Sequence, residues 1–512
     1  GIFQVGNQYS KTWSFTDINY AIASKEDKTS MFLDYSELLN ALDSGASAKI
    51  TIYNRRINKA EFERSVLLPD KADGLDEYRH EFNKMLTAQV TGTSNSIVRE
   101  RYLTVSVVKR NADEARSYFA RVGTDLVTHL AQLSSVAQEL TLTERLHIFR
   151  DFFKAGEQAA AEFNIHEHAK RGQHFKDWFC PDSMEFAADH FKVDARYGRV
   201  LYLQDYASYI KDSFVSELCD LDRDLMLSID ILPVPTDEAA RQLQSTLLGV
   251  ETNVANWQRR QNANNNFTAT IPYDMELQRK ETKEMLDDLT TRDQRMMFGL
   301  VTLVHLADSK EQLDSDTETL YSTARKHLCQ LSTLRWQQKD GLDTVLPYGL
   351  RKIQALRTLT TESTAVLIPF RAQEIMQPNG LYYGQNAVSK NMIVADRRLL
   401  LNGNSFRLGV SGSGKSMSAK EEIVQIALST EDDILILDPE SEFGYLTEAL
   451  GGEVIRISAT SDTHINALDM DRAYGDERNP IVSKSEFVLS LFEQLIGDGM
   501  VTAKEKSILG RC

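Results

Sequence analysis

Cysteine is scarce in this sequence of 512 residues, which contains four, at Cys180, Cys219, Cys329 and Cys512. None of them forms a C-x-x-C pair. This spacing indicates free thiols in a reducing compartment rather than a disulfide framework. The chain also does not open on the basic and then apolar segment that is typical of a secretion signal. We therefore expect a cytoplasmic protein.

Excess basic charge and long apolar runs are missing as well. The net charge of −16 argues against bulk electrostatic capture of nucleic acid, because phosphate binding normally needs a basic face. The most apolar long stretch, MMFGLVTLVHLA at 296–307, is too short to span a membrane and contains Thr302 and His305. We interpret it as a buried strand.

Composition and length indicate several packed domains. The chain is 42% hydrophobic and 26% charged, as is usual for globular proteins, and its length favours about three domains. Changes in the sequence pattern suggest where the boundaries lie. We predict an N-terminal α/β domain over 1–195, a second α/β domain over 196–360 and a P-loop domain over 361–512.

Apolar segments followed by helix caps recur in the first two predicted domains. Ser309 and Gln312, for example, have the spacing of a capping box that starts a helix. Strands are expected at 48–58, 101–109, 224–234, 296–307 and, as the partner of the last, 331–337. Such strand–helix units with short connections predict a mixed α/β region of ferredoxin-like α+β layers.

The segment RLGVSGSGKSMSAKEE at 407–422 raises the question of function most directly. It fits the pattern G-x-x-x-x-G-K-[ST], whose glycines let backbone N–H groups point at phosphate oxygens at the start of a helix. Lys415 is expected to reach the β- and γ-phosphates, and Ser416 to bind Mg²⁺. The predicted ATP site comprises Gly409, Val410, Ser411, Gly412, Ser413, Gly414, Lys415, Ser416 and Met417.

The surrounding residues predict a RecA-like domain with a parallel sheet. A strand is expected at 404–408, a helix at 415–429 and two further strands at 434–437 and 453–457. The run ILIL at 434–437 is typical of a strand buried on both faces. On the helix, the apolar residues that i, i+4 spacing places on one side are Ile423, Val424, Ala427 and Leu428.

Hydrolysis requires a carboxylate that holds Mg²⁺ at a strand end. Asp438, Glu440 and Glu442 follow the strand at 434–437, which makes Asp438 and Glu440 catalytic candidates. RecA-like motors, however, take this carboxylate from a strand further along the chain. Two other interpretations therefore stay open: a supporting element beside the site, which we favour for Asp438, and a solvated turn.

Two clusters outside the P-loop are weaker candidates. His166, His168 and His174 lie near Cys180, but their spacing matches no compact zinc site, and a polar surface segment is favoured.

The segment NWQRRQNANNNF at 256–267 contains Trp257, Arg259, Arg260 and Phe267, which could clasp nucleic acid. A helix end followed by a polar loop is favoured. Arg397 and Arg398 are candidates for a phosphate contact across a subunit boundary on residue type alone.

Taken together, these segments resemble the large ATPases of conjugative type IV secretion systems, the CagE/TrbE/VirB family, in the form found in integrative conjugative elements of Gram-positive bacteria. The resemblance covers essentially the whole chain. The stretches that carry it are SFTDINYAIASKEDK, ERLHIFRDFF, DYASYIKDSFVSELCDL, ETNVANWQRRQNANNNF, LTTRDQRMMF, LNGNSFRLGVSGSGKS, DPESEFGYL and GGEVIRISATSDTHINALDM.

The resemblance implies an N-terminal α/β region and a RecA-like motor that forms hexamers. The motor works with other conjugation-channel proteins at the cytoplasmic face of the membrane, uses ATP and Mg²⁺, and contacts DNA only indirectly. By position, Gly409, Gly412, Gly414, Lys415 and Ser416 match the Walker A loop, and Asp438, Glu440 and Glu442 match an acidic segment. The family's Walker B acids and its later glutamine and arginine would lie beyond Cys512, so we expect the chain to stop inside its motor domain.

Two alternatives remain. The chain could be a nucleotide-binding scaffold of the same apparatus that does not hydrolyse ATP. It could also be a DNA-pumping hexamer of FtsK/HerA type, which the acidic charge and the absence of membrane anchors make less favoured.

Overall fold

The computed structural model describes the chain apart from residues 57–65, 93–96, 155–169, 171, 173, 208, 265–269, 293, 459, 470–479, 498–500 and 511–512. The chain divides into two units, Gly1–Arg407 (unit 1) and Leu408–Cys512 (unit 2), which we describe separately. Within the described residues, no helix is both long enough and apolar enough to cross a membrane.

The described strands all belong to unit 1. They are β1 (Phe3–Val5), β2 (Gln8–Phe15), β3 (Ala46–Arg56), β4 (Ile97–Val108), β5 (Ala137–Glu139), β6 (Met184–Phe186), β7 (Phe191–Val193), β8 (Arg196–Asp205), β9 (Leu225–Pro233), β10 (Met296–Ala307), β11 (Gln330–Thr333), β12 (Arg357–Thr360), β13 (Leu381–Gln385) and β14 (Met392–Ala395).

Helices occur in both units. Those of unit 1 are α1 (Lys25–Asn40), α3 (Asp76–Gly92), α4 (Ala112–Gln132), α5 (Leu142–Phe153), α7 (Phe175–Phe179), α8 (Phe214–Leu218), α9 (Thr236–Ala263), α10 (Tyr273–Thr291), α11 (Lys310–Lys326), α12 (Gln338–Val345), α13 (Thr361–Ala365) and the 3₁₀ turn η2 (Arg397–Leu399). Those of unit 2 are α14 (Lys415–Ser429), α15 (Gly444–Ala449), α16 (Pro480–Ile496) and α17 (Ala503–Leu509).

Unit 1 is built on one 12-stranded sheet. Its order is β1-β2-β4-β3-β9-β10-β8-β7-β6, with β5 beside β2, β11 beside β8 and β12 beside β10. The pairings within it are antiparallel, so the fold is mixed α/β with an antiparallel sheet. The sheet takes strands from both of the first two predicted domains: Ile50 of β3 lies opposite Ile229 of β9, and β7 pairs with β8.

The sheet contains the same chain connection twice. In the first half, β2, β3, β4 and β5 follow one another along the chain and lie in the order β5-β2-β4-β3. In the second half, β8, β9, β10 and β11 lie in the corresponding order β11-β8-β10-β9. Numbered within its own half, each set has the order 4-1-3-2. The two halves are joined through the second strand of each, β3 and β9.

Helices cover both faces of this sheet. On one face, α1, α4 and α11 pack over a core that includes Ile50, Val301 and Leu303. On the other face, α5 and α12 pack over a core that includes Leu300 and Val304. Because side chains alternate between faces along a strand, β10 is buried on both sides. The prediction of a buried strand at 296–307 is confirmed.

The predicted partner of that strand is wrong. β11 pairs with β8, where Leu331 lies opposite Leu203, and not with β10. The edges of β10 are already occupied by β9 on one side and by β8 and β12 on the other. Sequence order suggested a hairpin-like neighbour, whereas the 4-1-3-2 order places β8 between the two strands.

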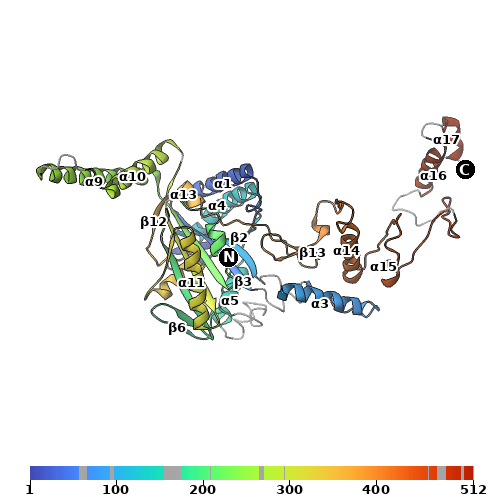
Figure 1. The fold of residues 1–512 in the computed structure, drawn as a ribbon, viewed down its shortest axis with the longest axis horizontal. Helices are drawn as coiled ribbons and strands as arrows, with labels where there is room; N and C mark the ends of the chain where they lie inside the picture. The colour runs from blue at the N-terminus through green and yellow to red at the C-terminus, as the bar shows by residue number, and fades with distance from the viewer. Residues whose placement is uncertain are drawn as a thin grey trace. The chain divides into compact units, whose positions relative to one another are not determined.

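Helices α9 and α10 pack against each other as a long antiparallel pair that projects from the sheet (Figure 1). The pair is anchored at its base, where Ala239, Leu243 and Leu289 join a small buried cluster with Met296 of β10. Toward the far end, Lys283 and Glu251 form a cross-helix ion pair at 3.5 Å. The helix end expected within 256–267 is confirmed, because α9 ends at Ala263.

Candidate nucleotide-binding site

The phosphate-binding pattern lies on a loop that leads directly into α14. The helix begins at Lys415, and Gly414 precedes it with a φ of 91°. Gly412 has a φ of 78°. These left-handed conformations are ones that glycine adopts without steric cost. The predicted helix at 415–429 is confirmed, and two of the three glycines of the loop occupy positions where the backbone needs them.

The third glycine allows a close approach. A Cβ atom at Gly409 would collide with Oγ of Ser413 and would lie 3.4 Å from Cγ of Lys415. The ammonium group of Lys415 donates a hydrogen bond to the carbonyl of Gly409 at 3.0 Å. The backbone of the loop therefore turns back on itself, so that its first residue, Gly409, contacts Lys415. An anion in this curl would compete with the Gly409 carbonyl for the lysine.

The start of α14 keeps the donors that a phosphate group needs. Helices leave their first N–H groups without intrahelical acceptors, and Gly414 supplies no side chain to cap them. The side chains from Leu408 to Ser418, including that of Ser416, are exposed. Exposed N–H groups, a positive helix end and a lysine within one turn suit a phosphate. A hydroxyl at position 416 suits a phosphate-bound Mg²⁺ ion.

Asp438 has a structural role in its turn. Its Oδ2 accepts a hydrogen bond from the backbone N–H of Phe443 at 2.8 Å. This bond, with contributions from other N–H groups of the turn, lowers the pKa of Asp438. Ser441, between them, has a φ of 57°. Asp438 thus holds the turn that precedes α15, while Glu440 is exposed to solvent.

This turn is linked to α14. The ammonium group of Lys420 lies over the ring of Phe443, 5.3 Å from its centre. Lys420 is on the second turn of α14, the helix that begins at Lys415. Asp438 therefore fixes a residue that contacts α14.

The parallel RecA-like sheet predicted around the loop is not shown. Within the described residues of unit 2 no strand occurs, and the segments 434–437 and 453–457 are without ladder hydrogen bonds. The helix buries only part of the side that the i, i+4 spacing predicts. Glu422, Gln425 and Leu428 are its buried residues, while Ile423 and Val424 are half-buried.

The weaker candidates gain no support as sites. His166 and His168 lie outside the described residues, and His174 caps α7 by accepting a hydrogen bond from the N–H of Lys176 at 3.2 Å. Across the described part of the chain, no three His, Cys, Asp or Glu residues are grouped as metal ligands.

The two arginine-containing candidates lie on local structure. Arg259 and Arg260 are exposed on α9 beside the half-buried Trp257, and Phe267 is outside the described residues. Arg398 of η2 bonds to the carboxylate of Asp396 at 2.9 Å.

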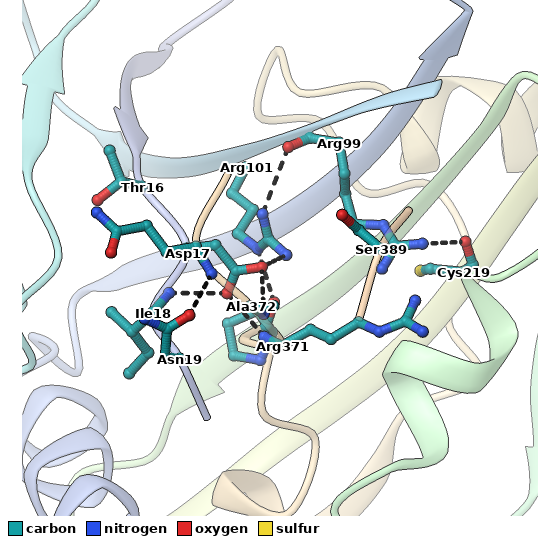
Figure 2. A network of polar contacts seen from close by, with 12 residues as sticks. Thr16, Asp17, Ile18, Asn19, Arg99, Arg101, Cys219, Arg371, Ala372 and Ser389 are labelled. Carbon is teal, nitrogen blue, oxygen red and sulfur yellow. Dashed lines mark hydrogen bonds and ion pairs between the residues drawn. The ribbon is translucent and has the colours of Figure 1, made fainter. Parts of the chain in front are cut away.

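Sequence reasoning missed a buried polar centre in unit 1 (Figure 2). Asp17 and Arg101 form an ion pair there, and the carboxylate also accepts the backbone N–H groups of Ile18, Arg371 and Ala372 at 2.7–3.0 Å. Arg101 donates through Nε to the carbonyl of Pro369 at 2.8 Å. Burial raises the pKa of Asp17, against the effect of Arg101 and the N–H groups.

This centre pins the segment after α13 to the sheet. Asp17 follows β2 and Arg101 is on β4, so both ends of the contact come from the first half of the sheet. The sequence contains no local signal for this pair, because Asp17 and Arg101 are 84 residues apart.

Neither the comparison with protein-family models nor the comparison with curated proteins finds a match for this chain. The function must therefore be argued from the loop, the fold and the resemblance of the sequence motifs.

Proposed function

We propose that unit 2 binds ATP with Mg²⁺ and that the protein is the ATP-driven motor of a conjugative type IV secretion system. The main support for the nucleotide site is the conformation of the loop. Gly412 and Gly414 have left-handed backbones, Gly409 meets Lys415, and an uncapped helix begins at that lysine. Each of these features is what a backbone cradle for phosphate needs.

In this proposal, the residues of the loop divide the work. Lys415 leaves the carbonyl of Gly409 and pairs with the β- and γ-phosphates, while the N–H groups at the start of α14 hold the phosphate oxygens. Ser416 places its hydroxyl on Mg²⁺, which when bound neutralises charge on the phosphates. Asp438 positions Phe443 against α14 and so supports the loop from behind.

The finer fold assignments belong to the same proposal. The order 4-1-3-2 in each half of the sheet is that of ferredoxin-like layers, which supports this assignment for unit 1. For unit 2 and the four residues before it we propose that 404–408, 434–437 and 453–457 form the parallel strands of a RecA-like sheet. The order of apolar segment, loop, α14, apolar segment and α15 along the chain supports it.

The wider assignments follow from the resemblance. We propose a hexameric motor at the cytoplasmic face of the membrane, in contact with other proteins of the conjugation channel and only indirectly with DNA. The stretches quoted for the resemblance extend over both units, which supports one function for the whole chain.

Nucleotide binding is tested by replacing the loop lysine. We expect Lys415→Ala to weaken ATP binding at least about tenfold, because it removes the charge-assisted contact with the phosphates. Titration calorimetry with ATP and Mg²⁺ measures the change. Lys504→Ala, which removes an exposed lysine of the same unit, is the matched control. Unchanged affinity in the Lys415 variant would remove the site assignment.

The hydrogen bond that Asp438 accepts within its own turn favours a second candidate function, a scaffold that binds ATP without hydrolysing it. Its Oδ2 is bonded to the backbone of its own turn. Binding of ATP with no release of phosphate would support the scaffold. Phosphate release that is lost in Lys415→Ala would support the motor.

A further inference from the structure

The outer edge of β11 has no neighbour among the described strands. β11 pairs with β8 on one side, and among the described residues no second strand and no side chain bonds to its backbone. The unpaired part of β4 is different. There, Asn391 donates to the carbonyl of Ile97 at 2.9 Å, and Arg101 donates to that of Arg99 at 3.4 Å. The edge of β11 is thus open, whereas that of β4 is closed by side chains.

This open edge lacks the usual protection. Its sequence, QLST, contains no charge and no proline, the two devices that commonly block the addition of another strand. Its counterpart in the first half of the sheet is β5, which carries Glu139 in an ion pair with Lys11 at 2.6 Å. Two strands in equivalent positions therefore differ in whether they resist edge-to-edge pairing.

Two residues with large apolar side chains flank β11, and both have strained backbone conformations. Leu328 is 82% exposed with a φ of 57°, and Trp336 is 83% exposed with a φ of 62°. Bulky residues rarely adopt such a φ, and strain of this kind gathers at binding surfaces. The N–H of Trp336 donates to the carbonyl of Ala188 at 2.7 Å, which fixes the backbone at this position. The edge is thus bordered on both sides by exposed apolar groups.

There is space beside the edge for another strand. An open cavity of about 1080 Å³ is lined by β8, α11 and the segment from Gln330 to Arg335. It presents charges of both signs, since Arg325, Arg335, Asp205 and Glu318 all line it. In the described part of the chain, none of these four has an ion-pair partner. Such a surface matches a copy of itself better than it matches a partner of one charge.

We propose that a second copy of this chain docks on this edge, with the two β11 strands antiparallel across a twofold axis at Ser332. Leu328 and Trp336 are each four residues from Ser332, so this register puts Leu328 opposite the partner subunit's Trp336, and the reverse. The molecule already contains an edge pairing of this kind, because β3 and β9 join its two halves antiparallel. With four-residue strands, the dimer is weak and depends on concentration.

Sedimentation of the full chain over a wide concentration range tests the proposal. Without added nucleotide, the wild-type chain is expected to shift from monomer to dimer as concentration rises, and Leu328→Gly to raise the dissociation constant about tenfold or more. Glycine accepts the φ of 57° at this position, so the monomer should be at least as stable to heat as the wild type. Leu248→Glu, which replaces an apolar side chain 68% exposed on α9, should leave association unchanged.

Cross-linking tests the register separately. Ser332→Cys should form a disulfide-linked dimer under oxidised glutathione, because residues paired across an antiparallel axis bring their Cβ atoms within about 5.5 Å. Ser315→Cys, on the exposed side of α11, and the wild-type chain give the background.

A chain that stays monomeric at every concentration would overturn the proposal. This holds even if the edge of β11 then binds an extended peptide of another protein. A dimer that Leu328→Gly leaves intact and Ser332→Cys does not cross-link would place the interface elsewhere. None of these readouts requires ATP, so they are independent of the proposed nucleotide site.

Discussion

The two units contain apolar runs of the same kind in very different surroundings. In unit 1, β10 has neighbours on both edges and helices over both faces, and Leu303 is fully buried. In unit 2, the run at 434–437 pairs with no strand among the described residues, and Leu435 and Leu437 are 91% and 88% exposed.

This difference shows what a strand needs beyond its own sequence. A β-strand is stabilised by its ladder and by packing on its faces, and isolated strands are not stable in water. In unit 1 the strands of the two 4-1-3-2 sets supply partners for one another, and the sets are joined edge to edge by β3 and β9. Exposed apolar side chains also occur at Leu408 and Ile457, near the other expected strands of unit 2. These surfaces are the ones that the proposed parallel sheet would bury.

The substitution expected to destabilise unit 1 most is the replacement of Arg101. Arg101→Met leaves the carboxylate of Asp17 buried without its counter-ion, and breaking a buried pair in this way costs about 3–5 kcal/mol. Urea unfolding followed by tryptophan fluorescence measures it, because all four tryptophans lie in unit 1.

Arg116→Met is the matched control for this change. It breaks an exposed pair with Asp113, for which at most about 1 kcal/mol is expected. Equal effects of the two substitutions would mean that the buried centre does not stabilise the sheet. ATP binding by the Arg101 variant should persist wherever unit 2 stays folded.

More of the secondary structure could be predicted from the sequence in unit 1 than around the candidate site in unit 2. Strands such as β4 and β10, and helices such as α11 with its Ser309 cap, were predictable because alternation and capping are local signals. The pairing of β11 with β8 was not predictable, because it depends on which strands meet in space.

The candidate site shows the same limit. The loop from Gly409 to Ser416 was fully predictable, since each glycine has a local backbone reason. The contact of Lys420 with Phe443 was not, because it forms between a helix and a turn that Asp438 holds. The buried pair of Asp17 and Arg101 likewise needs the folded sheet to bring its members together.

A buried histidine makes unit 1 sensitive to pH. Burial, and then the charge of Arg199, lowers the pKa of His305 to about 3. Its Nε2 lies 3.0 Å from Oγ1 of Thr317, and the Thr317 hydroxyl donates to the carbonyl of Leu313, so His305 is the donor in this pair.

Protonation therefore favours the unfolded chain, in which histidine titrates near 6.5. The free energy of unfolding should fall as the pH drops from about 6.5 toward about 3, by up to about 1.4 kcal/mol per pH unit. His305→Gln keeps a donor for Thr317 without the titration, and should flatten this slope in urea unfolding series. His80→Gln, at a histidine 64% exposed, should leave the slope as it is. A slope unchanged in His305→Gln would assign the pH dependence to other groups.

The smallest expected effect gives the sharpest comparison of the two units. Leu303→Ala in β10 removes a fully buried side chain and should cost about 2–5 kcal/mol in tryptophan-detected unfolding. Leu437→Ala removes one that is 88% exposed, and should change the local stability of unit 2 by no more than about 0.5 kcal/mol, measured by amide hydrogen exchange. A loss at Leu437 close to that at Leu303 would mean that this side chain is buried in solution. In that case the run at 434–437 is a central strand in solution, as the proposed parallel sheet requires.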